Sequence, residues 1–288
     1  MTDRVPGSND ALRNRLQLAV GGAAVLGEEL PASGGRRLFE ALDGPVSSPG
    51  GAARLRVMLY PRPSVGPDPA AVTMYLQKVR ELAHPGLILP TASGDFEGHT
   101  WLAEPAPVAP TAREWLRDNG PFPIRDGVQA MRALARALTA LQRRGLAHGA
   151  IALESVRIDG VTAQLSAVGA STTGTVRGDL DALALVAWAL LTGEETPPAG
   201  APLSRYRRGV PRELDALFAA MLAERVDKRP ADAVAILDAL DAIPTPATSP
   251  ASRLIDGFGA GSRPRRTRAA IGVLAALAVV ALLYWLSR

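Results

Sequence analysis

Apolar positions follow a strand-like pattern in the first part of the chain. Between residues 23 and 105, short apolar runs are separated by glycine and proline, and in one of them Leu55, Val57 and Leu59 occupy alternate positions. This alternation predicts a strand with one buried face. A helix is predicted over 68–82, because Pro69 stands near its start and a His-Pro pair follows its end. The pattern therefore predicts a small sheet interrupted by one helix.

After residue 110 the apolar spacing becomes helical. Thr111 is placed to cap a short helix, and a long helix that follows is expected to stop at Gly145. A short hairpin turning at Asp159-Gly160 comes next. Three further helices are predicted at 179–193, 211–224 and 229–243. The chain therefore belongs to the α+β class.

The end of the chain has a different character. Residues 269–286 form an uncharged apolar run that is long enough to cross about 30 Å of hydrocarbon as a helix. A buried core helix would normally carry a polar stripe, which this run lacks, so we predict a single C-terminal transmembrane helix. Arginines at 263, 265, 266 and 268, at the end of the Pro/Ser/Arg-rich linker 244–268, predict that the preceding domain lies in the cytoplasm. The expected location is the cell membrane. No signal-peptide core precedes the domain, and 1–22 is interpreted as an N-terminal arm.

Composition excludes several kinds of site. The chain has no cysteine, and its three histidines are scattered, so we expect neither a disulfide framework nor a metal site. The net charge of +4 comes from arginines that accompany neither interleaved aromatics nor a nucleic-acid-binding motif. We therefore expect no nucleic-acid partner.

The order of elements resembles the bilobal protein kinase fold. The resemblance is to bacterial Ser/Thr kinases, and it implies a first lobe at 23–105 and a second lobe at 106–243. Eight segments of this chain match kinase segments in the same order. They are 26–43 (the Gly-rich loop and second strand), 53–60 (the third strand), 84–90 (the region after helix C), 99–107 (the hinge), 146–158 (the catalytic loop), 165–170 (the DFG turn), 178–193 (the helix with a buried aspartate) and 224–240 (the closing helices).

The residues that a kinase uses to bind nucleotide are replaced at the matching positions. Phosphoryl transfer needs a lysine on the phosphates and a close-fitting glycine loop. The only lysines are Lys78 and Lys228, so Arg56, or Met58 in a shifted alignment, takes the lysine position. Glu104 stands at the hinge. The degenerate glycine loop contains Pro31, Ser33, Gly34 and Arg36.

The catalytic and metal-binding positions are replaced too. Ala150 stands at the position of the catalytic base, Ser155 at that of the magnesium-binding asparagine and Ala167 at that of the DFG aspartate. The resemblance is therefore to a degenerate member, a pseudokinase, and it implies neither kinase chemistry nor a cofactor.

Residues that support the kinase fold are retained. Asp179 matches the buried aspartate that bonds the catalytic-loop backbone, and His148 is interpreted as a core histidine. The segment between Gly169 and Asp179 is much shorter than a kinase activation loop and has no APE-like motif. In related kinases the arginine that matches Arg229 pairs with the glutamate of that motif. Because this chain lacks the motif, we expect Arg229 to find another acceptor or face water.

Two functions follow from these observations. The first is a membrane-anchored cytoplasmic pseudokinase that acts as a scaffold or regulator. The chain resembles actinobacterial pseudokinase domains associated with the lipid II flippase, and this resemblance implies a role in peptidoglycan control. The alternative is an atypical nucleotide-binding Ser/Thr kinase that uses Arg56 and Glu104. The expected partner is a membrane protein or a phosphothreonine reader, with candidate phosphosites at Thr172, Thr173 and Thr175.

Overall fold

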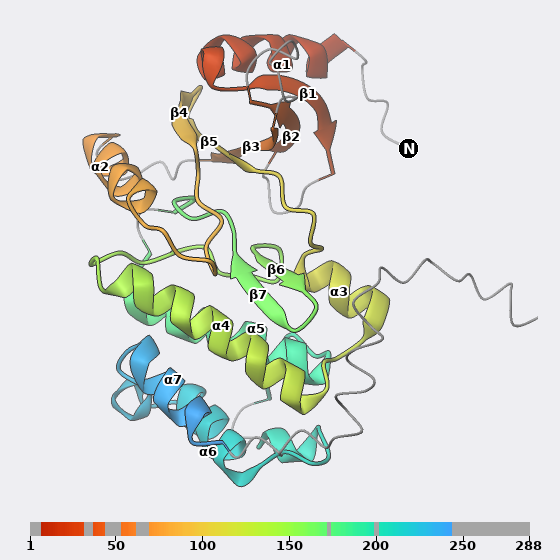
Figure 1. Cartoon of the computed structure of the whole chain (residues 1–288), viewed down its shortest axis with the longest axis vertical. Coiled ribbons are helices and arrows are strands. Elements are labelled where there is room, and N and C mark those ends of the chain that lie inside the picture. Colours follow the sequence, from red (N-terminus) through yellow and green to blue (C-terminus); the bar gives the residue numbers. More distant parts are fainter. Residues whose placement is uncertain are drawn as a thin grey trace, which may run out of the picture. The chain divides into compact units, whose positions relative to one another are not determined.

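The described residues form two lobes within one compact unit, Met1–Pro244. The computed structural model describes residues 7–31, 37–43, 53–61, 69–171, 174–198 and 202–243 (Figure 1). The predicted linker, the predicted transmembrane helix and the positions Ser33, Gly34, Arg36, Thr172 and Thr173 lie outside these ranges. Within the described ranges, no helix combines the length and hydropathy that a membrane crossing requires.

The first lobe is built on an antiparallel sheet of five strands in the order β1-β2-β3-β5-β4, which confirms the predicted sheet. Helix α2 (Pro69–Arg80) precedes β4 and lies within the predicted range 68–82. The strands are β1 (Val25–Leu30), β2 (Arg37–Leu42), β3 (Arg54–Pro61), β4 (Ala92–Phe96) and β5 (His99–Pro105).

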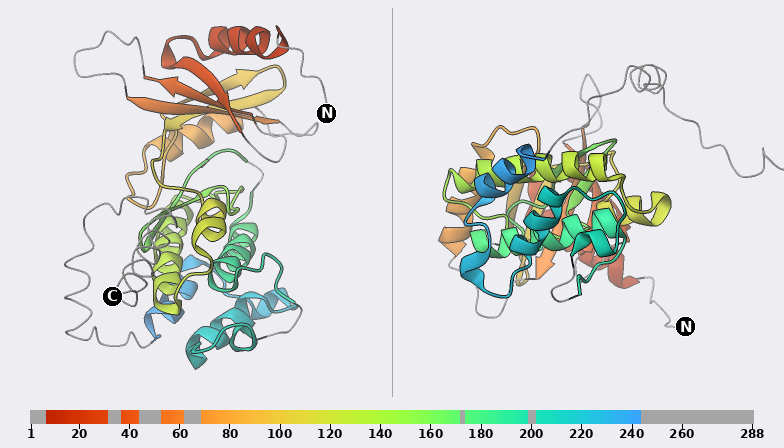
Figure 2. Two further views of the ribbon diagram at one scale, coloured as in Figure 1. Left: turned by 90° about the vertical axis from the view of Figure 1, so that its right-hand side faces the viewer. Right: turned by 90° about the horizontal axis from the view of Figure 1, so that it is seen from below.

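One face of this sheet is covered by α1 (Gly7–Val20), which forms most of the predicted N-terminal arm. Leu16 and Val20 of this helix are buried with Val57 of β3 and Trp101 of β5. A short 3-10 helix, η1 (Gly21–Ala23), connects α1 to β1. Figure 2 shows α1 and α2 on opposite faces of the sheet. Because α1 supplies the apolar cover, the sheet does not present this face to water.

The prediction that β3 has one buried face is wrong. Its other face carries Arg56, Met58 and Tyr60, whose exposed fractions are only 6%, 6% and 7%. Alternation in the sequence reports which side chains share a face, but it does not report what covers that face. Here α1 covers one face, and residues of α2 and of the second lobe cover the other.

The second lobe is mainly helical, and its core contains the fully buried Trp188. Thr111 caps α3 as predicted: its side chain accepts a hydrogen bond from the Glu114 N–H, while the Glu114 carboxylate accepts one from the Thr111 N–H. The long helix ends shortly before Gly145, whose positive φ suits a glycine. The helices are α3 (Ala112–Asn119), α4 (Ile124–Gln142), α5 (Val176–Thr192), η2 (Leu203–Arg205), α6 (Arg212–Met221), η3 (Val226–Lys228) and α7 (Ala233–Asp241).

A two-stranded hairpin lies between α4 and α5, as the sequence predicted. Strands β6 (Val156–Asp159) and β7 (Thr162–Leu165) pair antiparallel, and Gly160 in the turn has a φ of +60°. The loop before β6 and the turn after β7 contain the positions that match the catalytic loop and the DFG turn. The hairpin therefore positions both segments at the boundary with the first lobe.

Candidate functional site

An ion pair occupies the boundary between the lobes. Arg56 of β3 lies directly across the ladder from Glu104 of β5. The Arg56 Nε donates to Glu104 Oε1 at 2.6 Å, and Nη2 contacts the same oxygen. The two side chains are 7% and 0% exposed. Burial raises the pKa of Glu104, while Arg56 and the Ala167 N–H act in the opposite direction.

The second oxygen of Glu104 connects the ion pair to the turn after β7. Glu104 Oε2 accepts a hydrogen bond of 2.9 Å from the Ala167 N–H. Ala167 has a φ of +63°, in the left-handed region that non-glycine residues rarely adopt. The bond to a buried carboxylate helps to hold this conformation, so a side chain of the first lobe positions the DFG-like turn.

Apolar side chains fill the space beside this ion pair. We call them the inner cluster: Met58, Tyr60, Leu76, Leu102 and Ala167, all buried. The Tyr60 hydroxyl lies 3.1 Å from the Met58 sulfur. Met58 shares a face of β3 with Arg56, so both candidates for the lysine position face the other lobe, one in the ion pair and the other in the inner cluster.

Helix α2 contacts the catalytic-like loop through Tyr75. In kinases the corresponding helix supplies a glutamate that pairs with the β3 lysine. Residues 69–80 contain no acidic residue. Instead, the Tyr75 hydroxyl donates to the Ala147 carbonyl at 2.5 Å. Burial, reinforced by the negative charge of Asp179, raises the pKa of Tyr75, so the hydroxyl keeps its proton and remains a donor.

Asp179 holds the backbone of the loop that matches the catalytic loop. Its two carboxylate oxygens accept hydrogen bonds from the His148 N–H at 2.6 Å and the Gly149 N–H at 2.8 Å. Burial raises the pKa of Asp179, and the two backbone donors oppose that rise. Since both oxygens are used by backbone groups, the arrangement is a structural support for the loop.

The polar side chains of this loop also bond to nearby backbone. His148 Nε2 lies 3.0 Å from the Ser166 carbonyl, and its Nδ1 accepts from the Ala150 N–H at 3.3 Å. Burial lowers the pKa of His148 to about 4, so the imidazole is neutral at physiological pH. The Ser155 hydroxyl lies within hydrogen-bond distance of the Ala150 and Ala152 carbonyls and accepts from the Ala152 N–H. In the described part of the chain, no three acidic or histidine side chains converge on a possible metal position.

The shortened segment after the DFG-like turn packs directly on this loop. A Cβ added to Gly174 would lie 2.1 Å from the Gly149 Cα, and one added to Gly149 would lie 2.7 Å from the Ser171 carbonyl oxygen. Only glycines allow this approach. Arg229 donates to the Ala223 carbonyl at 2.7 Å and pairs with Asp181 at 3.0 Å, so it has acceptors other than the missing APE-like glutamate.

Among the candidate phosphosites, only Thr175 lies within the described residues. It is exposed and forms the N-cap of α5, where its hydroxyl accepts from the Gly178 N–H at 3.0 Å. The neighbouring Arg177 donates to the Pro230 carbonyl at 2.8 Å. Pro31, from the degenerate glycine loop, is exposed at the end of β1.

Tyr75 and Arg157 also belong to this site, although no sequence pattern predicted them. Arg157 lies on β6, and its Nε is buried without a hydrogen-bond partner in the described structure. Burial and the nearby Arg56 lower its pKa to about 10, and Glu104 opposes this shift. Strand β6 reads Val-Arg-Ile-Asp, so its alternation places Arg157 on the polar face with Asp159 and gave no signal that Arg157 would be buried.

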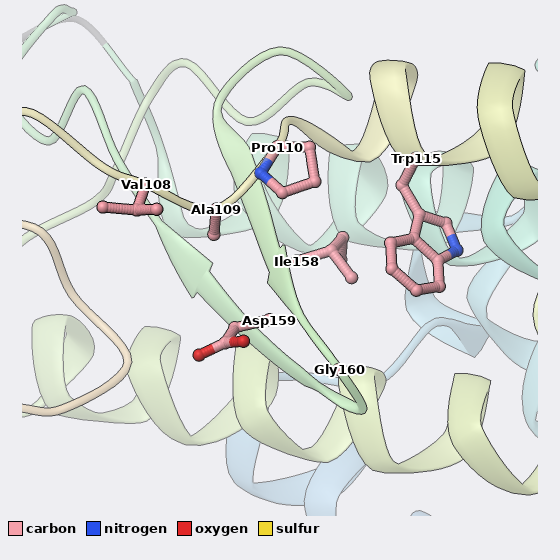
Figure 3. Close-up of a pocket in the computed structure, with 7 residues that line it drawn as sticks. All are labelled: Val108, Ala109, Pro110, Trp115, Ile158, Asp159 and Gly160. Carbon is pink, nitrogen blue, oxygen red and sulfur yellow. The ribbon is translucent and has the colours of Figure 1, made fainter. Parts of the chain in front are cut away.

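A separate pocket lies beside the hairpin, as Figure 3 shows. Its volume is about 320 Å³. It is formed by the segment after β5, by α3 and by the β6–β7 turn. The lining residues are Val108, Ala109, Pro110, Trp115, Ile158, Asp159 and Gly160.

Comparison with known proteins supports the fold. No protein-family model matches the chain. Among solved structures, the crystal structure of Rad53 1-466 in complex with AMP-PNP is similar, with a TM-score of 0.60 and 13% sequence identity. The match covers 75% of this chain and 64% of that chain, so the chain spans less than two thirds of the solved one. At this identity, the likeness establishes a protein kinase-like fold and nothing finer.

Proposed function

We propose that this kinase-like domain is a pseudokinase that acts as a scaffold or regulator and does not transfer phosphate. The main support is the filled boundary between the lobes. The Arg56–Glu104 pair and the inner cluster occupy the sheet face where a kinase holds its nucleotide. Further support comes from the matching positions: Arg56 pairs with Glu104, the Ser155 hydroxyl bonds to local backbone, and the alanine side chains at 150 and 167 offer neither a base nor a metal ligand.

The alternative function, an atypical kinase that uses Arg56 and Glu104, is less consistent with this geometry. Each of the two side chains is already the main partner of the other. A nucleotide phosphate would have to separate them, which would leave the Glu104 carboxylate, 0% exposed, without its cation. Leaving one member of a buried pair uncompensated costs about 3–5 kcal/mol.

Nucleotide binding by the purified full-length chain tests this proposal. We expect the melting temperature to be the same with and without Mg-ATP at millimolar concentration. A ligand that binds only the folded state at 100 times its Kd would add about 2.7 kcal/mol to the unfolding free energy, which is readily seen as a melting shift. A magnesium-dependent shift would reject the proposal in favour of the atypical kinase.

We also propose that the domain is held at the inner face of the cell membrane by residues 269–286, with a role in control of the cell envelope. The support is the uncharged apolar run and the arginines that precede it. Carbonate washing of membranes should leave the full-length protein in the pellet, and truncation before Arg263 should release it. Release of the full-length protein by the wash would contradict the anchor.

Phosphorylation of the shortened activation segment is the proposed route to a phosphothreonine-reading partner. A phosphate on Thr172, Thr173 or Thr175 would add a charge that arginine-containing reader domains bind. A genuine Ser/Thr kinase should modify the chain within this segment, as mapped by mass spectrometry, and the modified chain should then bind a forkhead-associated domain.

The control variant has to respect the capping role of Thr175. Replacing it with alanine would remove an N-cap, at a cost of about 0.5–2 kcal/mol. We therefore combine Thr172→Ala and Thr173→Ala with Thr175→Asn, since asparagine is a strong N-cap that cannot be phosphorylated. Equal reader binding by this variant and the wild type would exclude the segment as the partner site.

A further inference from the structure

The pocket beside the hairpin is separate from the filled boundary between the lobes. Successive side chains of a strand point to opposite faces. On β6, Ile158 lines the pocket, whereas the adjacent Arg157 interacts electrostatically with Arg56 and Glu104. Asp159, on the same face of β6 as Arg157, also lines the pocket, but the lining includes neither member of the ion pair and no residue of the inner cluster.

The lining of the pocket is part polar and part apolar, and its apolar part includes two packed side chains. Ile158 is 1% exposed, and the Trp115 ring packs against Phe122 with their centroids 5.2 Å apart. Two exposed valines extend the apolar surface, because Val108 is fully exposed and Val161, in the hairpin turn, is 46% exposed. Single exposed apolar side chains are common, but these two lie on segments that form the same pocket.

The polar groups at the rim are available for a partner. The exposed Asp159 carboxylate forms no ion pair in the described part of the chain. The backbone N–H groups of Val108 and Ala109 have no hydrogen-bond acceptor within the described residues. The Ala109 carbonyl receives only a long contact of 3.5 Å from Arg157 Nη1.

These features favour a peptide over a small molecule. A volume of about 320 Å³ lies at the lower end of the roughly 300–1,000 Å³ that is typical of small-molecule pockets. Val161 is not part of the pocket lining, so a ligand confined to the pocket would leave it uncovered, whereas an extended peptide would cover it together with Val108. Free backbone donors along the rim suit pairing with an extended chain, and the Asp159 carboxylate selects a positive charge.

We propose that this pocket binds an extended segment of a partner protein. An aliphatic side chain of that segment enters between Trp115 and Ile158, and an arginine or lysine one or two residues away pairs with Asp159. Peptide backbone groups bond to the free N–H groups of Val108 and Ala109. The proposal extends the scaffold function by assigning it a docking surface, and it does not depend on whether the cleft binds nucleotide.

Fluorescence anisotropy with the purified full-length chain tests this proposal. The probe is a labelled octapeptide with two arginines followed by two leucines at alternate positions, and a second probe carries glutamates in place of the arginines. Asp159→Lys should weaken binding of the arginine probe about tenfold and strengthen binding of the glutamate probe. Val108→Ser should weaken both probes about threefold. Both residues are exposed, so neither change should unfold the domain.

The matched control is Asp238→Lys, which makes the same change of charge at an exposed position of α7. It should leave binding of both probes unchanged. An equal loss of binding in the Asp159 and Asp238 variants would mean a general charge effect and would overturn the proposal. Failure of the wild type to bind the arginine probe at 1 mM would also overturn the proposal. A dimer that sedimentation detects and that Asp159→Lys dissociates would overturn it as well, because a second copy of the chain would then occupy the pocket.

Discussion

Removal of Glu104 should destabilise the domain because it leaves two buried groups without their partner. Arg56 would keep its charge with only 7% of its side chain exposed, and the Ala167 N–H would lose its acceptor. The positive charge of Arg157 repels that of Arg56, and without Glu104 this nearby negative charge no longer opposes the repulsion. Breaking a buried pair in this way costs about 3–5 kcal/mol. Because domains of this size have a total stability of about 5–15 kcal/mol, Glu104→Ala should be close to the limit of folding.

Replacing both partners should be much less harmful. In Arg56→Met with Glu104→Leu, both members of the pair are removed together, and the new side chains extend the inner cluster. Arg157 loses the nearby Glu104 carboxylate but also the repulsion from Arg56. Apolar replacement of a buried ion pair is often neutral or stabilising. We therefore expect the double variant to regain most of the stability that Glu104→Ala loses, apart from about 1–3 kcal/mol for the unsatisfied Ala167 N–H.

Urea unfolding of the purified chain, followed by tryptophan fluorescence, measures these effects. Trp101 reports on the first lobe and Trp188 on the second, and both are buried. If Glu104→Ala costs less than about 1 kcal/mol, the pair is hydrated in solution and the idea of a filled cleft is wrong. A double variant that is as unstable as Glu104→Ala would show that the charges themselves are needed.

Three other changes should have measurable effects. The folded pKa of His148, about 4, is below its unfolded value of 6.5, so the unfolding free energy should fall by a total of about 3 kcal/mol as pH falls from 6.5 towards 4. In His148→Gln this pH slope should flatten, and an unchanged slope would contradict a buried neutral His148. Asp179→Ala should cost about 2–4 kcal/mol by urea unfolding, because the buried N–H groups of His148 and Gly149 lose their acceptors; a normal unfolding curve would disprove the support role. Gly174→Ala should lower stability by about 1–3 kcal/mol because the new Cβ would meet the backbone of Gly149, whereas the Cβ of Gly22→Ala would meet nothing within 4 Å and should be tolerated. Similar melting temperatures for the two variants would reject the close packing of Gly174 on Gly149.

The sequence predicted most of the local structure. The spacing of apolar residues and the capping signals located the sheet, α2, the hairpin and the helices of the second lobe. Thr111 and Gly160 are examples, because capping and tight turns depend on a few neighbouring residues. The order of these elements was also sufficient to indicate the kinase-like fold, which the solved-structure comparison supports.

The candidate site depended more strongly on tertiary structure. The sequence identified Arg56 and Glu104 separately, as a replaced lysine and a hinge residue, but their ion pair joins positions 48 residues apart. The same holds for Tyr75 and Ala147, which meet only when α2 packs near the catalytic-like loop. No local pattern encodes such contacts.

Burial on both faces of the sheet was likewise decided by packing. The alternation around Val57 was correct, but the helix formed by the N-terminal arm covers one face, and Met58 on the other face meets Leu102 and Ala167. The pocket beside the hairpin also combines three separate segments, at 108–110, Trp115 and 158–160. Periodicity in a sequence determines which side chains point the same way, whereas the surface they meet is supplied by distant parts of the chain and exists only after they pack together.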